Sequence, residues 1–211
     1  MGSKSLAQTP AHRNGPVSYD VRPHMLARWL FLVFVAVLIG CGDGSEPISP
    51  AEELSIATPP ALLRRQLDEA LPLAATWLNE TAATMLLNAR PLSPDEIAMA
   101  IDAGITKPGD VRVALVDEMA LPQDEPLHTL ALQLGFANKA LAGGAIGNLV
   151  WLNRKHSKNV ALLAHELMHV AQQERVGQVH FLRRYFSELA LVGYKRSAIE
   201  AEANRFMAKY K

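Results

Sequence analysis

The spacing of apolar residues predicts a chain that is mostly helical. From 61 to 88, apolar side chains recur three or four positions apart, although Pro72 predicts a kink or a second helix start. Ser93 and Pro94 are typical of a helix start, and Gly104 is typical of the end of that helix. A helical turn is expected at 51–58, and further helices from Ser157 or Asn159 to Gly177, from 179 to 192 and from Ser197 onward.

Two segments have the pattern of strands. Residues 111–116 alternate and carry β-branched side chains, and residues 145–153 form a second apolar segment. Gly143 and Gly147 fit hairpin or bulge positions, whereas 127–141 favours neither helix nor strand. Together the patterns predict an α+β fold, mainly helical, with a small β-sheet whose edge strand lies next to the helix that ends near Gly177.

The N-terminal part has the pattern of a secretory signal. An unbroken apolar run of 12 residues covers 29–40, whereas a membrane-spanning helix needs about 20 residues. Basic residues precede this run, and Cys41, the one cysteine of the chain, follows it. The sequence Leu38-Ile39-Gly40-Cys41 resembles the lipobox of bacterial lipoprotein precursors. The competing interpretation is a buried N-terminal helix that ends in a chance cysteine.

The lipobox resemblance implies that residues 1–40 are removed as a signal peptide and that Cys41 is lipidated. The protein would then be anchored in a bacterial cell envelope, on the periplasmic face or the outer membrane if the cell is Gram-negative. Met25 is an alternative start of this signal. The mature chain is expected to comprise a flexible tether at 41–60, a helical N-terminal segment at 61–110 and a zincin-like domain at 111–211.

The charge of the chain balances overall but is unevenly distributed. The formal net charge is zero, so no nucleic-acid partner is expected. Residues 43–153 carry 6 basic and 15 acidic side chains, and residues 154–211 carry 11 basic and 5 acidic ones. A solvated basic face is favoured over a site for acidic substrates. A further hypothesis is a self-inhibited precursor, in which the acidic 51–104 segment covers the basic part.

The candidate chemistry lies in the HExxH sequence of residues 165–169. His165 and His169 are four positions apart, so on a helix they point the same way and can bind one zinc ion. Glu166 is placed to act as general base toward a water on the metal. The apolar residues around the motif predict a helix whose back is buried, which separates this motif from a chance match. The Gln172-Gln173 pair is expected to lie at the surface near the helix end.

A catalytic zinc site needs a third protein ligand and an open position for water. Arg175 stands where a metzincin would have its third histidine, so that class is excluded. Glu200 lies 31 residues after His169, with Asn204 one turn further, where it could orient a ligand histidine. Ser197 and Glu200 also fit a capping box, in which case Glu202 is the alternative ligand. The remaining candidates by residue type are Glu174, His180 and Glu188.

The HExxH segment and the residues after it resemble a known family. The pattern LLxHExxHVxQ at 162–172 precedes Phe181-Leu182-Arg183-Arg184-Tyr185, Gly193-Tyr194 and Glu200-Ala201-Glu202-Ala203. This order resembles small bacterial gluzincin-type peptidases, the minigluzincin or DUF4157 type, over roughly 111–208. The resemblance implies a zinc ion held by His165, His169 and Glu200. Asn204 stands where related gluzincins have aspartate, and Ser197-Ala198-Ile199 replaces the usual entry to the last helix.

The expected function is zinc-dependent hydrolysis of peptide bonds in a peptide or protein substrate. Glu166 would be the general base, and Tyr194 or His180 would stabilise the oxyanion. The segment at 145–153 is expected to pair with an extended substrate. The rival hypothesis is a lipid-anchored binding or structural module whose zinc is a staple, closed by a fourth ligand such as His180.

Overall fold

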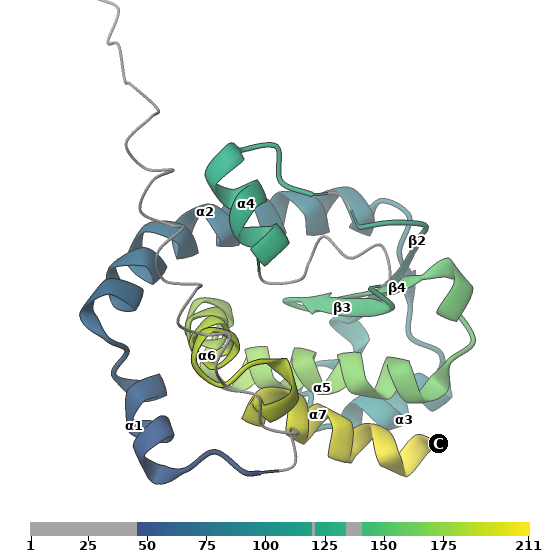
Figure 1. Cartoon of the computed structure of the whole chain (residues 1–211). Coiled ribbons are helices and arrows are strands. Elements are labelled where there is room, and N and C mark those ends of the chain that lie inside the picture. The colour runs from purple at the N-terminus through teal and green to yellow at the C-terminus, as the bar shows by residue number, and fades with distance from the viewer. Residues whose placement is uncertain (1–45, 120, 134–140) are drawn as a thin grey trace, which may run out of the picture.

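The structure is a computed structural model that describes residues 46–119, 121–133 and 141–211. Helices predominate, and a four-stranded mixed sheet lies among them, so the expected α+β, mainly helical fold is confirmed (Figure 1). The helices are α1 (Pro50–Ala57), α2 (Ala61–Leu86), α3 (Pro94–Asp102), α4 (Glu125–Gln133), α5 (Val160–Val176), α6 (Gln178–Leu191) and α7 (Ala198–Met207). The strands are β1 (Arg90–Pro91), β2 (Arg112–Val116), β3 (Gly143–Ile146) and β4 (Leu149–Asn153).

The strands of the sheet are ordered β1-β2-β4-β3. β2 and β4 are parallel, with Arg112 opposite Leu149, whereas β3 and β4 form an antiparallel hairpin. The prediction of one strand over 145–153 is therefore wrong. Gly147 adopts a positive φ of 57°, which a glycine tolerates, and this turn divides the segment into two strands.

Every residue of β4 is buried, because helices cover both faces of the sheet. Val150 and Leu152 face a core shared with α3, α5 and α7, and Leu149 and Trp151 pack toward α2. Figure 1 shows α5, α7 and α3 below the sheet and α2 across its other side. This layering fixes α5, which carries the HExxH sequence, directly against the sheet.

Helix α2 runs continuously from Ala61 to Leu86, so no second helix starts at Pro72. Three leucines on its first half pack against α6, in a core that includes Phe181 and Phe186. The second half of α2 packs near the sheet through Ala82. The helical N-terminal segment is thus joined to the HExxH helices by shared apolar cores.

Ion pairs also join the acidic N-terminal part to the basic C-terminal part. Arg196 binds Glu52 of α1 at 2.8 Å, and Arg184 binds Glu53 at 2.6 Å. Both pairs are exposed enough for solvent to screen them, so they position α1 more than they add to stability. Part of the uneven charge distribution along the sequence is therefore neutralised by ion pairs within the molecule.

No described helix is long and apolar enough to cross a membrane. Three expected features lie outside the described residues: the apolar run at 29–40, Cys41 and the start of the expected tether.

Candidate metal centre

Helix α5 presents the two HExxH histidines from a buried position. It begins after Asn159, whose Oδ1 accepts a hydrogen bond from the backbone N–H of Leu162 at 3.0 Å, so Asn159 and not Ser157 is the cap. Leu163 and Leu167 anchor the helix in the core. The motif therefore lies on a rigid helix that the fold holds in place.

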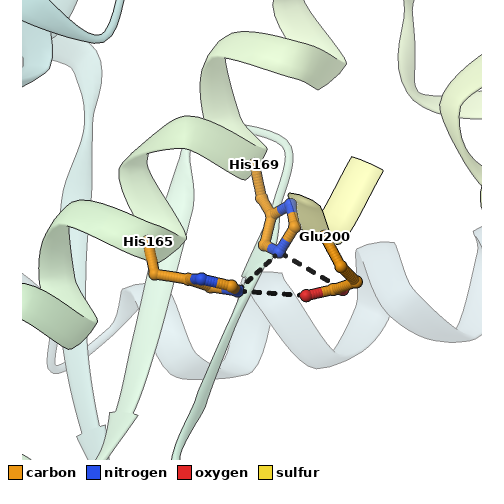
Figure 2. A group of neighbouring side chains, drawn as sticks. All are labelled: His165, His169 and Glu200. Carbon is orange, nitrogen blue, oxygen red and sulfur yellow. Dashed lines mark hydrogen bonds and ion pairs between the residues drawn. The ribbon is translucent and has the colours of Figure 1, made fainter. Parts of the chain in front are cut away.

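The structure brings His165, His169 and Glu200 together (Figure 2). The Nε2 atoms of the two histidines are 3.1 Å apart. Oε2 of Glu200 is 3.3 Å from His165 Nε2, and its Oε1 is 3.6 Å from His169 Nε2. Ligand atoms at about 2.0–2.1 Å from one tetrahedral zinc lie about 3.3 Å from one another. The spacing of these three groups therefore matches that of zinc ligands.

The hydrogen bonding of Glu200 also fits a cation. Its Oε2 atom is buried and, among the residues that the structure describes, has the His165 imidazole 3.3 Å away but no hydrogen bond of good geometry. An unsatisfied buried polar atom costs about 1–3 kcal/mol, and a metal ion would satisfy it. Burial alone would raise the pKa of Glu200, but the close contact with His165 and the charge of His169 lower it below its usual value. The carboxylate is thus favoured as an anion.

The two histidines differ in their protonation. Burial lowers the pKa of His169, which favours the neutral imidazole that binds metals. Burial would also lower the pKa of His165, but the close contact with Glu200 and the charge of Glu166 raise it overall. A metal ion therefore has to compete with a proton at His165.

Glu200 does not act as the second half of a capping box. Ser197 Oγ accepts a hydrogen bond from the backbone N–H of Glu200 at 3.2 Å, but the Glu200 carboxylate points toward the histidines. The carboxylate of Glu188 supports this helix start instead. Its Oε2 accepts hydrogen bonds from Ser197 Oγ at 2.6 Å and from the backbone N–H of Ile199 at 3.2 Å.

The other ligand candidates lie outside the cluster. Glu202 accepts hydrogen bonds from Gln172 at 2.8 Å and from Arg175 at 2.7 Å. Glu174 accepts hydrogen bonds from Thr106. His180 is exposed and is not a member of the cluster.

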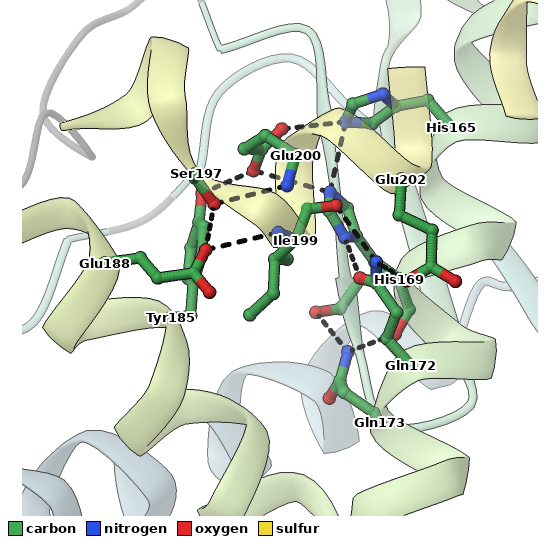
Figure 3. Close-up of polar contacts among 11 residues, drawn as sticks. His165, His169, Gln172, Gln173, Tyr185, Glu188, Ser197, Ile199, Glu200 and Glu202 are labelled. Atoms are coloured by element: carbon green, nitrogen blue, oxygen red, sulfur yellow. Dashed lines mark hydrogen bonds and ion pairs between the residues drawn. The ribbon is translucent and has the colours of Figure 1, made fainter. Parts of the chain in front are cut away.

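Two residues whose role the sequence did not reveal hold the candidate ligands from behind (Figure 3). The Tyr185 hydroxyl donates a hydrogen bond to Glu200 Oε1 at 2.7 Å. Nδ1 of His169 is 2.7 Å from Oε1 of Gln172, which leaves Nε2 directed at the cluster. Tyr185 belongs to the family pattern quoted above, but that pattern gave it no role. Asn204 contributes to the raised pKa of His165, and its role in orienting that histidine stays a prediction.

The expected surface position of Gln172 and Gln173 is wrong. Both are buried, because α7 and β3 pack over this end of α5. Gln173 accepts a hydrogen bond from the backbone N–H of Gly147 at 2.9 Å and donates one to the Ala145 carbonyl at 3.2 Å. Gln172 thus orients a candidate ligand, whereas Gln173 attaches the β-hairpin to the same helix.

Glu166 lies beside the cluster and is 4% exposed. Burial raises its pKa to about 8, against the lowering effect of His165, and the charge of Glu200 adds to the increase. A β-carbon at Gly143 would lie 3.1 Å from Glu166 Oε1, so a glycine gives this carboxyl group its space beside β3. The carboxyl group of Glu166 therefore lies beside the three candidate ligands with a strongly shifted pKa, which is a feature of functional sites.

Tyr194 lines the same cavity as the three candidate ligands and is 55% exposed. Burial of part of its ring and the nearby Glu200 raise the pKa of its hydroxyl, so the group stays protonated and remains a hydrogen-bond donor. The structure thus places Tyr194 next to the cluster and leaves His180, the other candidate for this role, outside the cavity lining.

Comparison with known families gives one match. A family model described as the eCIS core domain, a DUF4157-like family, matches residues 137–177, which include the HExxH helix. Comparisons with curated proteins and with solved structures gave no match. The matched part is less than a quarter of the chain and contains both histidines and Glu166, while Glu200 lies beyond it.

Proposed function

We propose that this protein is a zinc-dependent hydrolase of peptide bonds. The observation that carries the proposal is the buried cluster of His165, His169 and Glu200, with Glu166 beside it on the wall of a cavity. Two histidines and one glutamate are a donor set of catalytic zinc sites. The same donor types also suit ferrous iron, so the identity of the metal is part of the test.

The described residues supply three ligands and no fourth. A structural zinc site is closed by four protein ligands, whereas a catalytic site keeps one position open. The cluster contains only His165, His169 and Glu200 among the described side chains, and His180 is outside it. This favours an open site over the rival hypothesis of a zinc staple.

Each neighbouring residue has a chemical task in the proposed reaction. Zinc, when bound, polarises the scissile carbonyl and makes water more acidic. The carboxylate of Glu166 takes a proton from the attacking water and passes it to the leaving amine. The Tyr194 hydroxyl donates a hydrogen bond to the oxyanion that develops.

The position of β3 supports a peptide as the substrate. β3 is the last strand of the sheet in the described part of the chain, and it lies next to α5. A strand at a sheet edge has unpaired backbone groups that an extended peptide can bind. Residues Gly143 and Gly144 of this strand also line the cavity. A peptide paired with β3 would pass directly over Glu166.

The test compares the wild-type protein with Glu166→Gln. The variant keeps the three ligands, so it should retain zinc at one ion per chain by elemental analysis while cleavage of a peptide library falls about 10²–10⁴-fold. His165→Ala should lose both zinc and cleavage. Equal cleavage by Glu166→Gln and the wild type would refute the mechanism. A chain that binds one zinc ion but cleaves no peptide would support the staple hypothesis.

We also propose that the protein is anchored by a lipid on Cys41 in a bacterial cell envelope. The basis is the apolar run at 29–40 followed by the chain's one cysteine. Mass spectrometry of the protein made in bacteria should find a processed chain that begins at an acylated Cys41. A Cys41→Ser variant should remain unprocessed. An acyl-free wild-type protein that keeps residues 1–40 would contradict the proposal.

A further inference from the structure

The cavity at the metal centre has two unlike walls. Most of the polar residues that line it, among them His165, Glu166 and Glu200, come from α5 and the segment that includes α7, and α6 adds the hydroxyl of Tyr185. The apolar part of the lining comes from α2, α4, α6 and the β3–β4 hairpin, with Trp77, Leu78, Leu127 and Phe186 among its residues. The volume of the cavity is about 180 Å³. A single space therefore joins a metal site to a chamber lined by apolar side chains.

Helix α2 supplies a wall of this chamber from outside the HExxH region. Its leucines at positions 63, 67 and 71 are buried in the core with α6. Trp77 and Leu78, by contrast, are only partly buried, although they lie on the same helix and line the cavity. Both also pack against the neighbouring cores, so they reach from packed cores into the cavity. Binding sites for apolar groups are lined by large apolar side chains of this kind. The N-terminal helical segment thus has a place in the site.

The size of the chamber limits the group that it can hold. A dry apolar cavity of about 150 Å³ accommodates one benzene molecule. A volume of 180 Å³, part of which belongs to the metal site, therefore suits one isobutyl, thioether or benzyl group. A charged side chain would lose its hydration there without gaining a partner on the apolar wall, so the chamber disfavours it.

We infer that α2, through Trp77 and Leu78, selects substrates with one bulky apolar side chain, of the size of leucine, methionine or phenylalanine, next to the scissile bond. This inference rests on the proposed peptidase function. Each buried methylene changes affinity about fourfold, so leucine should be preferred to alanine at this position by about 10- to 100-fold in kcat/KM. Aspartate should be cleaved more slowly than alanine.

The first experiment measures kcat/KM of the zinc-loaded full-length protein on peptides that differ only in this residue. Leu78→Trp adds volume to the wall of the chamber. It should reverse the preference in kcat/KM, so that peptides with alanine at this position are cleaved better than peptides with phenylalanine. Trp77→Ala enlarges the chamber and should reduce the discrimination between leucine and phenylalanine. Leu73→Ala is the matched control, because Leu73 lies on α2, is half exposed and is not among the lining residues. An unchanged preference in both chamber variants would overturn the inference.

A second experiment does not depend on catalysis. Binding of toluene to the metal-free full-length protein is followed by NMR of side-chain methyl groups, and the signals of Leu78 and Leu127 should shift. Leu78→Trp should weaken toluene binding at least tenfold, whereas Leu73→Ala should leave it unchanged. If Leu78→Trp does not fold, Trp77→Ala should still change the set of shifted methyl groups.

The two experiments separate the inference from the function on which it rests. In one outcome the chamber variants change toluene binding, but the protein cleaves no peptide. This result would support the apolar chamber and refute the proposed peptidase function. In the other outcome the protein cleaves peptides without preference for apolar residues and does not bind toluene. This result would refute the apolar chamber and support the proposed peptidase function.

Discussion

The hydroxyl of Tyr185 lies 2.7 Å from Oε1 of Glu200 and donates a hydrogen bond to it. Partners of this kind hold a metal ligand in its binding orientation, and their loss typically costs 10- to 100-fold in metal affinity. We therefore expect Tyr185→Phe to weaken zinc binding by about that factor, as measured by competition with a chromophoric chelator. Tyr210→Phe is the control, because the Tyr210 hydroxyl donates its hydrogen bond to Asp102, which does not belong to the cluster. Equal affinities of Tyr185→Phe and the wild type would contradict this role.

Gln172 and Gln173 are neighbours on α5 with separable tasks. Gln172→Leu removes the partner of His169 Nδ1, so it should lower zinc affinity about 10- to 100-fold. Gln173→Leu removes the hydrogen bonds to the β3–β4 hairpin and should mainly lower the free energy of unfolding, by about 1–3 kcal/mol. Isothermal titration calorimetry with zinc and urea denaturation measure the two effects. The assignment fails if Gln173→Leu reduces zinc affinity more than Gln172→Leu does.

The fully buried carboxylate of Glu188 joins Arg184 to the start of α7. It accepts hydrogen bonds from Arg184 at 2.6 Å and from Ser197 at 2.6 Å. Glu188→Ala leaves both donors without this partner, and breaking a buried ion pair in this way costs about 3–5 kcal/mol. Because Arg184 is partly exposed and also binds Glu53, we expect the lower end of that range in urea denaturation. A loss below about 1 kcal/mol would show that water replaces Glu188 at little cost.

Acid should release α1 from the rest of the molecule. Arg196, with Ser49, lowers the pKa of Glu52 from 4.5 to about 2, and Arg184 lowers the pKa of Glu53. Because the folded pKa of Glu52 lies below the unfolded one, its pairing stabilises the docked helix above about pH 4.5. This stabilisation is lost as the pH falls from 4.5 toward 2. An NMR titration of the Glu52 carboxyl group should show the low pKa, and Arg196→Gln should raise it toward 4.5, with the hydrogen bonds of Ser49 still holding it below that value.

The local features of the fold could be predicted from the sequence, whereas the contacts between distant segments could not. Ser93 and Asn159 mark the starts of their helices, because their side chains accept hydrogen bonds from the first turn. The HExxH spacing alone places His165 and His169 on the same side of a helix. The Glu200 side chain faces the histidines instead of completing the cap of its own helix, and Glu188 of α6 accepts hydrogen bonds from Ser197 Oγ and the backbone N–H of Ile199 at that helix start. No pattern in the sequence predicts that Glu188 binds the start of α7.

Burial on a helix end was equally hard to predict. Two adjacent glutamines near a helix terminus have the pattern of solvent-exposed residues, yet α7 and β3 cover Gln172 and Gln173. The turn at Gly147 was predicted only as a hairpin or bulge, because the apolar residues on either side of it read as one strand. In the same way, the sequence of α2 predicts no binding role for this helix, since that role depends on the cavity that Trp77 and Leu78 line.

The parallel pairing of β2 with β4 has a consequence for how the molecule folds. The β3–β4 hairpin and α5 follow one another in the chain, so they can assemble through contacts that are close in sequence. β2 ends at Val116 and β4 begins at Leu149, and a parallel pair can form only after the long intervening segment has closed into a loop. Contacts of this kind slow folding. We therefore expect β2 to dock after the hairpin and α5, as a late step in refolding.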